Sequence, residues 1–149
     1  MRKHLLLLVA IALAVPAAAR LPVIVPLGRA QPAPPALTGI DGLRADFLAH
    51  SGADTIYFVS DSTILGAPAQ ATLQAQAMWL RQHPEVMVRI EGHAEPADTR
   101  DYALAIGARR AEEVRNYLVL LGVPAAQLNV MSWGKERPGA PRAVTVLVR

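Results

Sequence analysis

One apolar stripe constrains the fold of this 149-residue chain more than any other feature. At spacings of four, three, four and three, it runs through Gly107, Ala111, Val114, Leu118 and Leu121. This spacing is typical of an amphipathic helix that buries one face. Because Gly107 has no side chain, we expect the helix to approach a sheet closely at that point. Gly122 and Pro124 predict the end of the helix.

Runs rich in β-branched residues lie on both sides of this helix. Thr55–Val59 predicts a buried strand, and Val86–Glu91 alternates like a strand with one buried face. Leu128–Trp133 and Ala143–Val148 predict two further strands, and Ala69–Gln82 predicts a helix between the first two. The order strand, helix, strand, helix, strand, strand indicates an α+β fold with helices packed on one mixed sheet.

The N-terminal residues have the pattern of a secretory signal peptide. Two basic residues precede the apolar run Leu5–Val15, and Ala17–Ala19 fits a small-residue cleavage site. The apolar run is short for a membrane span, which needs roughly 20 residues. We therefore expect residues 1–19 to be a signal peptide, with a second possible cut after Ala30. An uncleaved anchor facing the periplasm is the alternative.

Three further segments follow the predicted signal. Residues 20–38 are rich in proline and alanine, which predicts a semi-rigid linker. Residues 39–53 predict a short helical lead-in, and residues 54–149 the folded domain. Removing the signal would take away two basic residues, so the net charge of +3 largely disappears. No basic stripe with interleaved aromatic residues is present, so we expect no nucleic-acid partner.

The residue types argue against several kinds of chemistry. The chain contains no cysteine, which excludes disulfides, thiol catalysis and thiolate metal sites. For the same reason we expect no lipid anchor of the bacterial lipoprotein kind. His50, His83 and His93 lack metal-ligand spacing, and we expect a structural role for His93. Alternation would place Glu91, His93 and Glu95 on one strand face, yet no Gly-x-Ser-x-Gly elbow accompanies them. We expect no catalytic residues and no cofactor.

Several segments in order resemble the OmpA-like domain. Ile90–Glu95 is similar to the strand-to-loop signature of that family, in which Gly-His-Ala/Thr-Asp ends a strand. Thr99–Tyr102 with Gly107–Ala111 resembles the helix that follows, and Ser132–Pro138 resembles a later strand and turn. The resemblance covers Asp54 to Val148, and within the family it is greatest to the peptidoglycan-associated lipoproteins. It implies an OmpA-like βαβαββ two-layer sandwich.

The resemblance also implies a function. OmpA-like domains bind the diaminopimelate end of a peptidoglycan stem peptide without covalent chemistry. Carried over, the ammonium of that group would be held by Glu95 and a carboxylate by Arg110, whose planar fork suits a carboxylate. Asp61 and Arg142 are further candidate ligand-binding residues: Asp61 is also suited to forming the turn after the first strand, and Arg142 is the one arginine kept where the family often has two. This predicts a non-catalytic protein of the periplasm and cell envelope, with a possible association with the outer membrane.

The chain also departs from the family at the implied site. Glu95 replaces an Asp, Ala103 replaces an Asn, and Val59 stands where an Asp is often found. These changes leave open a degenerate domain that binds periplasmic or outer-membrane proteins and not the wall. On the residues alone, Glu95 is also compatible with a solvated loop acid, and Arg110 with an ion pair on the helix surface.

Overall fold

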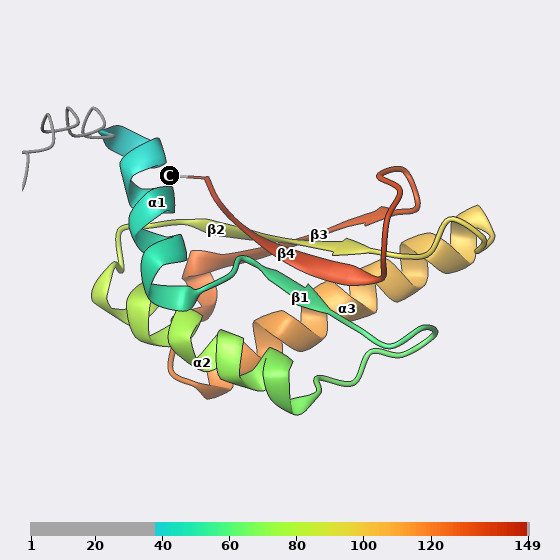
Figure 1. The fold of residues 1–149 in the computed structure, drawn as a ribbon, viewed down its shortest axis with the longest axis horizontal. Helices are drawn as coiled ribbons and strands as arrows, with labels where there is room; N and C mark the ends of the chain where they lie inside the picture. The colour runs from blue at the N-terminus through green and yellow to red at the C-terminus, as the bar shows by residue number, and fades with distance from the viewer. Residues whose placement is uncertain (1–37, 149) are drawn as a thin grey trace, which may run out of the picture. The chain divides into compact units, whose positions relative to one another are not determined.

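The computed structural model describes residues 38–148, shown as a ribbon in Figure 1. In chain order, its helices and strands are α1 Gly39–Ser51, β1 Thr55–Tyr57, α2 Ala67–Gln82, β2 Val88–His93, α3 Arg100–Leu120, β3 Leu128–Gly134 and β4 Arg142–Leu147. Within these residues, no helix combines the length and apolarity needed to cross a lipid bilayer. The predicted signal and most of the predicted linker lie outside the described residues.

The four strands form one mixed sheet in the order β1-β4-β2-β3. β2 and β3 are parallel, whereas β4 is antiparallel to both β1 and β2. α3 provides the crossover between β2 and β3, as parallel neighbours require. Figure 1 shows α2 and α3 on the same side of the sheet, so its other face carries no helix layer. The predicted α+β fold is confirmed.

The core lies between the sheet and this helix layer. Val88 and Ile90 of β2 are fully buried, as are Leu73 and Leu80 of α2 and Leu118 of α3. Burying a side chain of this size contributes about 1.5–3 kcal/mol each, relative to leaving it in water.

The predicted lead-in helix belongs to the same fold. Phe47 of α1 is buried and packs edge-on against Trp79 of α2, with ring centroids 5.2 Å apart. The indole Nε1 of Trp79 donates a hydrogen bond to Asp46 Oδ2 at 2.7 Å. α1 is therefore fixed to α2 by an aromatic contact and by a hydrogen bond.

The close approach predicted at Gly107 is confirmed. A Cβ atom at Gly92 of β2 would lie 1.8 Å from the carbonyl oxygen of Gly107. A Cβ atom at Gly107 would lie 2.6 Å from Ser132 Oγ and 3.0 Å from the Gly92 carbonyl oxygen. The backbones of α3 and the sheet are thus in direct contact, and only glycine fits on either side. This contact sets the distance between α3 and β2, the strand that leads into the turn at His93–Glu95.

Two predicted strand boundaries are wrong. β1 ends at Tyr57, and Tyr57 and Val59 are 65% and 75% exposed, so Thr55–Val59 is not a buried strand throughout. The reason is that β1 lies at the sheet edge and pairs only with β4. β2 begins at Val88, two residues later than predicted, and continues to His93.

Replacing Gly92 with alanine should therefore destabilise the chain far more than the same change at Gly66. The new methyl group would overlap the Gly107 carbonyl, and overpacking of this kind costs about 3 kcal/mol or more. A Cβ atom at Gly66 would meet nothing closer than 3.8 Å. Gly66→Ala should therefore lower the free energy of unfolding by less than about 1 kcal/mol. Urea denaturation measures both changes. Equal losses would contradict the close contact.

Candidate functional site

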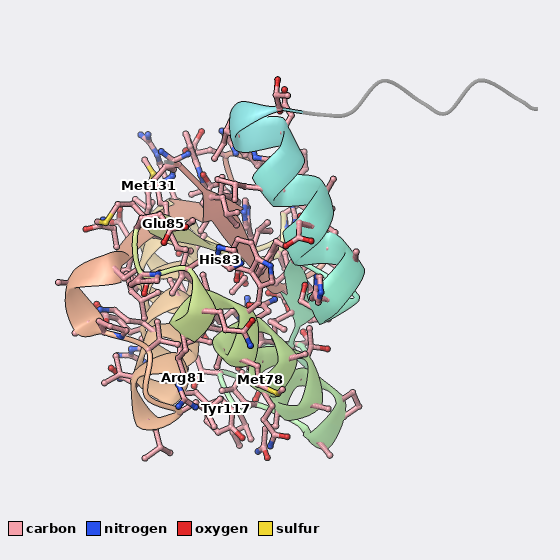
Figure 2. All side chains as sticks on the ribbon, turned by 90° about the vertical axis from the view of Figure 1, so that its left-hand side faces the viewer. Met78, Arg81, His83, Glu85, Tyr117 and Met131 are labelled. Carbon is pink, nitrogen blue, oxygen red and sulfur yellow. The ribbon has the colours of Figure 1, made fainter. Side chains whose placement is uncertain are left out.

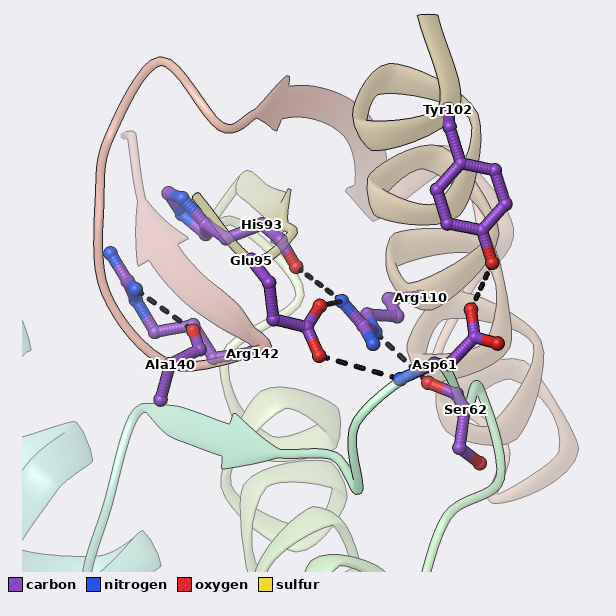
Figure 3. A network of polar contacts seen from close by, with 8 residues as sticks. All are labelled: Asp61, Ser62, His93, Glu95, Tyr102, Arg110, Ala140 and Arg142. Atoms are coloured by element: carbon purple, nitrogen blue, oxygen red, sulfur yellow. Dashed lines mark hydrogen bonds and ion pairs between the residues drawn. The ribbon is translucent and has the colours of Figure 1, made fainter. Parts of the chain in front are cut away.

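The guanidinium of Arg110 joins three segments of the chain. Arg110 lies on the inner face of α3 and is 0% exposed. Its Nε donates to the carbonyl oxygen of Ser62 at 2.9 Å, and its Nη1 donates to the carbonyl oxygen of His93 at 2.9 Å. Nη1 also contacts Glu95 Oε2 at 3.2 Å. Figure 3 shows these contacts converging from α3, from the loop after β1 and from the end of β2.

One nitrogen of this guanidinium is left without a hydrogen-bond partner in the described part of the chain. Nη2 of Arg110 is buried and has no hydrogen-bond acceptor among residues 38–148. A buried unsatisfied donor costs about 1–3 kcal/mol or more for a charged group. The Phe58 ring covers part of the same guanidinium, whose Cζ lies 5.5 Å from the ring centroid. Arg110 thus retains the two N–H donors of Nη2 unused.

The carboxylate of Glu95 is held from several sides. Besides the contact with Arg110, its Oε1 accepts the backbone N–H of Asp61 at 3.3 Å. Burial raises the pKa of Glu95, but hydrogen bonds from Ser60, from its own backbone and from Arg110, with the charge of Arg110, hold the pKa below its usual value. The side chain remains 20% exposed. Glu95 is therefore an ionised acid that solvent can still reach.

Asp61 contributes to the site through its backbone. Its φ of 55° is left-handed, a conformation that aspartate adopts more readily than most residues. The turn directs the Asp61 N–H toward Glu95, while the carboxylate accepts a hydrogen bond from the hydroxyl of Tyr102. This hydrogen bond raises the pKa of Tyr102. The side chain of Asp61 thus ties the loop to the first turn of α3 and does not contact Glu95 or Arg110.

Arg142 lies apart from the other three predicted residues. It pairs with His93 across β2 and β4, and its Nη1 donates to the carbonyl oxygen of Ala140 at 3.0 Å. Within the described part of the chain, no carboxylate lies at ion-pair distance from it. Figure 3 shows Arg142 and Asp61 on opposite sides of Glu95. The fold thus brings Asp61, Glu95 and Arg110 together and leaves Arg142 facing another part of the loop region.

His93 contributes its carbonyl oxygen to the site, where it accepts a hydrogen bond from Arg110. Its ring is 1% exposed, and neither ring nitrogen has a hydrogen-bond partner within residues 38–148. Burial first, and then the charges of Arg142 and Arg137 against the opposing charge of Glu91, lower the pKa of His93 to about 4. His93 is therefore neutral near pH 7. No group of three or more metal-binding side chains occurs among the residues described.

A groove lies beside the ion pair. It has a volume of about 600 Å³, and its lining includes Tyr57, Phe58, Val59, Ser62 and Ile64. Phe58 and Ser62 belong both to this groove and to the surroundings of Arg110. The sequence alone did not single out Ser62 or Phe58 as site residues. Their one signal was the polar run that interrupts the strand immediately after Phe58.

The pKa of His93 predicts a specific pH dependence of stability. An unfolded histidine binds a proton near pH 6.5, but folded His93 does so only near 4. Between these values the unfolded state binds more protons, so the free energy of unfolding should fall as the pH is lowered from 6.5 to 4 and should then level off. His93→Gln should remove this component, whereas His50→Gln on the exposed end of α1 should retain it. Denaturation at a series of pH values tests this, and identical profiles for the two variants would refute it.

Comparison with known proteins places the chain in a family. The family model described as "OmpA family" matches residues 57–146. The peptidoglycan-associated lipoprotein of Rhizobium meliloti (strain 1021) is 47% identical over 117 residues, which cover 71% of this chain and 66% of the relative. The protein of the same name from Pseudomonas aeruginosa is 43% identical over 101 residues, 68% of this chain and 60% of the relative. The matches thus span less than two thirds of these relatives.

Solved structures give the same result for the fold. The crystal structure of the peptidoglycan-associated lipoprotein from Burkholderia pseudomallei is 37% identical, with a TM-score of 0.63 over 65% of this chain and 92% of that one. The C-terminal domain of Helicobacter pylori MotB, at 20% identity, has a TM-score of 0.59 over 64% of this chain and 84% of that one, and it supports the fold alone. The resemblance inferred from the sequence is confirmed, and the chain belongs to the OmpA family.

Proposed function

We propose that this chain is a cell-envelope protein that binds peptidoglycan without covalent chemistry, at the site built by Glu95 and Arg110. The names of its relatives associate them with peptidoglycan, and the charge pair carries the proposal to this chain. The ligand would be the diaminopimelate end of a stem peptide, which presents an ammonium and a carboxylate. The predicted signal at residues 1–19 and linker at residues 20–38 would place the domain in the periplasm, near the outer membrane.

Glu95 is suited to the ammonium group of this ligand. Its carboxylate is ionised near neutral pH and is fixed by Arg110 and by the Asp61 N–H. A carboxylate has about four acceptor positions, so these contacts leave room for a further donor on its exposed side. Since the acid is already oriented, an ammonium would bind without having to order it first.

Arg110 is suited to the carboxylate because its Nη2 has no partner in the part of the chain that is described. A ligand carboxylate would satisfy this donor with a charge-assisted hydrogen bond. Phe58 and Ser62 cover the guanidinium and also line the adjacent groove. We therefore expect the loop after β1 to shift when the ligand enters. Arg142, on the far side of Glu95, would contact more distant parts of the stem peptide.

A second candidate function is a protein-interaction module that has kept the fold and lost the ligand. The main observation in its favour is the complete burial of Arg110, whose charge is already paired with Glu95. Ala103, at the position of a family Asn, is buried with Ala94 and Ile106 in a small apolar cluster. It therefore offers no polar group to a ligand. In this case the ion pair would serve only to hold the loops.

Calorimetry with a diaminopimelate stem tripeptide separates these functions. Wall binding predicts that the wild type binds and that Glu95→Gln, which keeps the size and loses the charge, weakens affinity by about tenfold to a hundredfold. The matched control is Glu113→Gln, which removes an exposed acid from α3 and should bind like the wild type.

A pull-down with purified peptidoglycan provides the second measurement. Retention of the wild type and of Glu113→Gln, with loss of Glu95→Gln, would support the assigned site. Equal retention of all three would reject the site, and no retention of the wild type would favour the interaction module. Thermal unfolding of each variant shows whether a loss of binding reflects a loss of folding.

A further inference from the structure

The helix-free face of the sheet carries charged side chains that neither the core nor the proposed wall site uses. Val88 and Ile90 face the helices and are fully buried. Because successive side chains of a strand point to opposite faces, Arg89, Glu91 and His93 point away from the helices. The loop after β3 covers His93, so Arg89 and Glu91 mark the open part of this face.

Glu91 organises a rigid arginine cluster there. Its side chain is 4% exposed and contacts Arg89 Nη2 at 2.7 Å and Arg137 Nη1 at 2.9 Å. The Arg137 guanidinium also lies over the Trp133 ring, 3.7 Å from its centroid. Nevertheless, the side chains of Arg89 and Arg137 are 40% and 51% exposed. Each guanidinium has five donors, so both retain donors that face solvent in a fixed orientation.

Apolar side chains lie beside this cluster on the same face. Met131 and Val144 are the cross-strand neighbours of Glu91, and Tyr57 is the neighbour of Arg142. Tyr57 is 65% and Met131 38% exposed. Figure 2 shows Met131 well separated from Met78, which lies on the helix layer. Aromatic residues, methionine and arginine are the types enriched in protein interfaces.

We propose that this face is a docking surface for a protein partner that presents an acidic segment, one face of which carries both carboxylates and apolar side chains. Within this cluster, Arg89 and Arg137 share the single acid Glu91, which leaves an excess of positive charge. In an extended segment every second side chain faces the sheet. Carboxylates at some of these positions would meet the arginines, and apolar side chains at the others would meet Met131 and Val144. The arginines are held in place by Glu91 and Trp133, so binding would cost little side-chain entropy.

The probe is a synthetic peptide with the repeat Glu-Ser-Val-Ser, which in an extended form presents glutamate and valine on the same face. The target is the full chain labelled with ¹⁵N. We expect amide shifts along β2 and β3 around Arg89 and Met131, and weaker binding at high salt. Met131→Glu adds a negative charge, like those of the peptide, beside the arginines and should weaken binding about tenfold. Because this glutamate would stand opposite Glu91, thermal unfolding of the variant shows whether the fold is kept. Met78→Glu is the matched control, because Met78 is 64% exposed on α2 and should leave binding unchanged.

Each other outcome overturns the proposal. These outcomes are shifts confined to another face, equal binding of a lysine–valine peptide, equal loss in both glutamate variants, or no binding by a folded wild type. Co-sedimentation with phosphatidylglycerol vesicles that Met131→Glu abolishes, without peptide binding, would assign the face to a membrane instead. The test does not depend on wall binding, since neither Met131 nor Met78 touches Glu95 or Arg110.

Discussion

The burial of one guanidinium shapes the functional end of this protein. A charge removed from water needs polar partners, and Nε and Nη1 of Arg110 find them in the Ser62 carbonyl, the His93 carbonyl and the Glu95 carboxylate. These groups come from segments that are remote in sequence. Their geometry depends on the contact between Gly92 and Gly107, because that contact sets how close α3 lies to β2. The site is therefore a consequence of helix-to-sheet packing.

The ion pair between Arg110 and Glu95 both prepares the site for a ligand and limits it. The ion pair orients Glu95 for an ammonium, yet it also uses part of the binding capacity of Arg110. What remains is the buried Nη2 group, close to Phe58 and Ser62, which also line an apolar groove. Wall binding would use the Nη2 donors, while a purely structural pair would leave them unsatisfied. The arginine cluster around Glu91 is separate from this site and lies on the helix-free face of the sheet. There the buried acid holds two arginines that still reach solvent.

Much of the fold could be predicted from periodicity, because helix and strand spacing survive in a single sequence. The stripe from Gly107 to Leu121 predicted both α3 and its close contact with the sheet. Strand limits were less predictable: Val59 is exposed because β1 ends at Tyr57, and that end depends on the pairing of β1 with β4. Glu95 and Arg110 were identified by resemblance alone. Nothing local in the sequence indicates that they pair with each other, or that Ser62 and Phe58 enclose Arg110, because these are contacts across long sequence separations.

The most direct test of the central role of Arg110 is NMR observation of its guanidinium protons while a diaminopimelate stem tripeptide is added. We expect saturable shifts of the Nη2 protons, together with slower exchange with water, as a ligand carboxylate occupies the unused donor. The backbone amide of Asp61 should shift at the same ligand concentrations, because it shares the Glu95 carboxylate. Saturable tripeptide binding that leaves the Arg110 side chain and Asp61 unchanged would contradict this role, as would the absence of any binding.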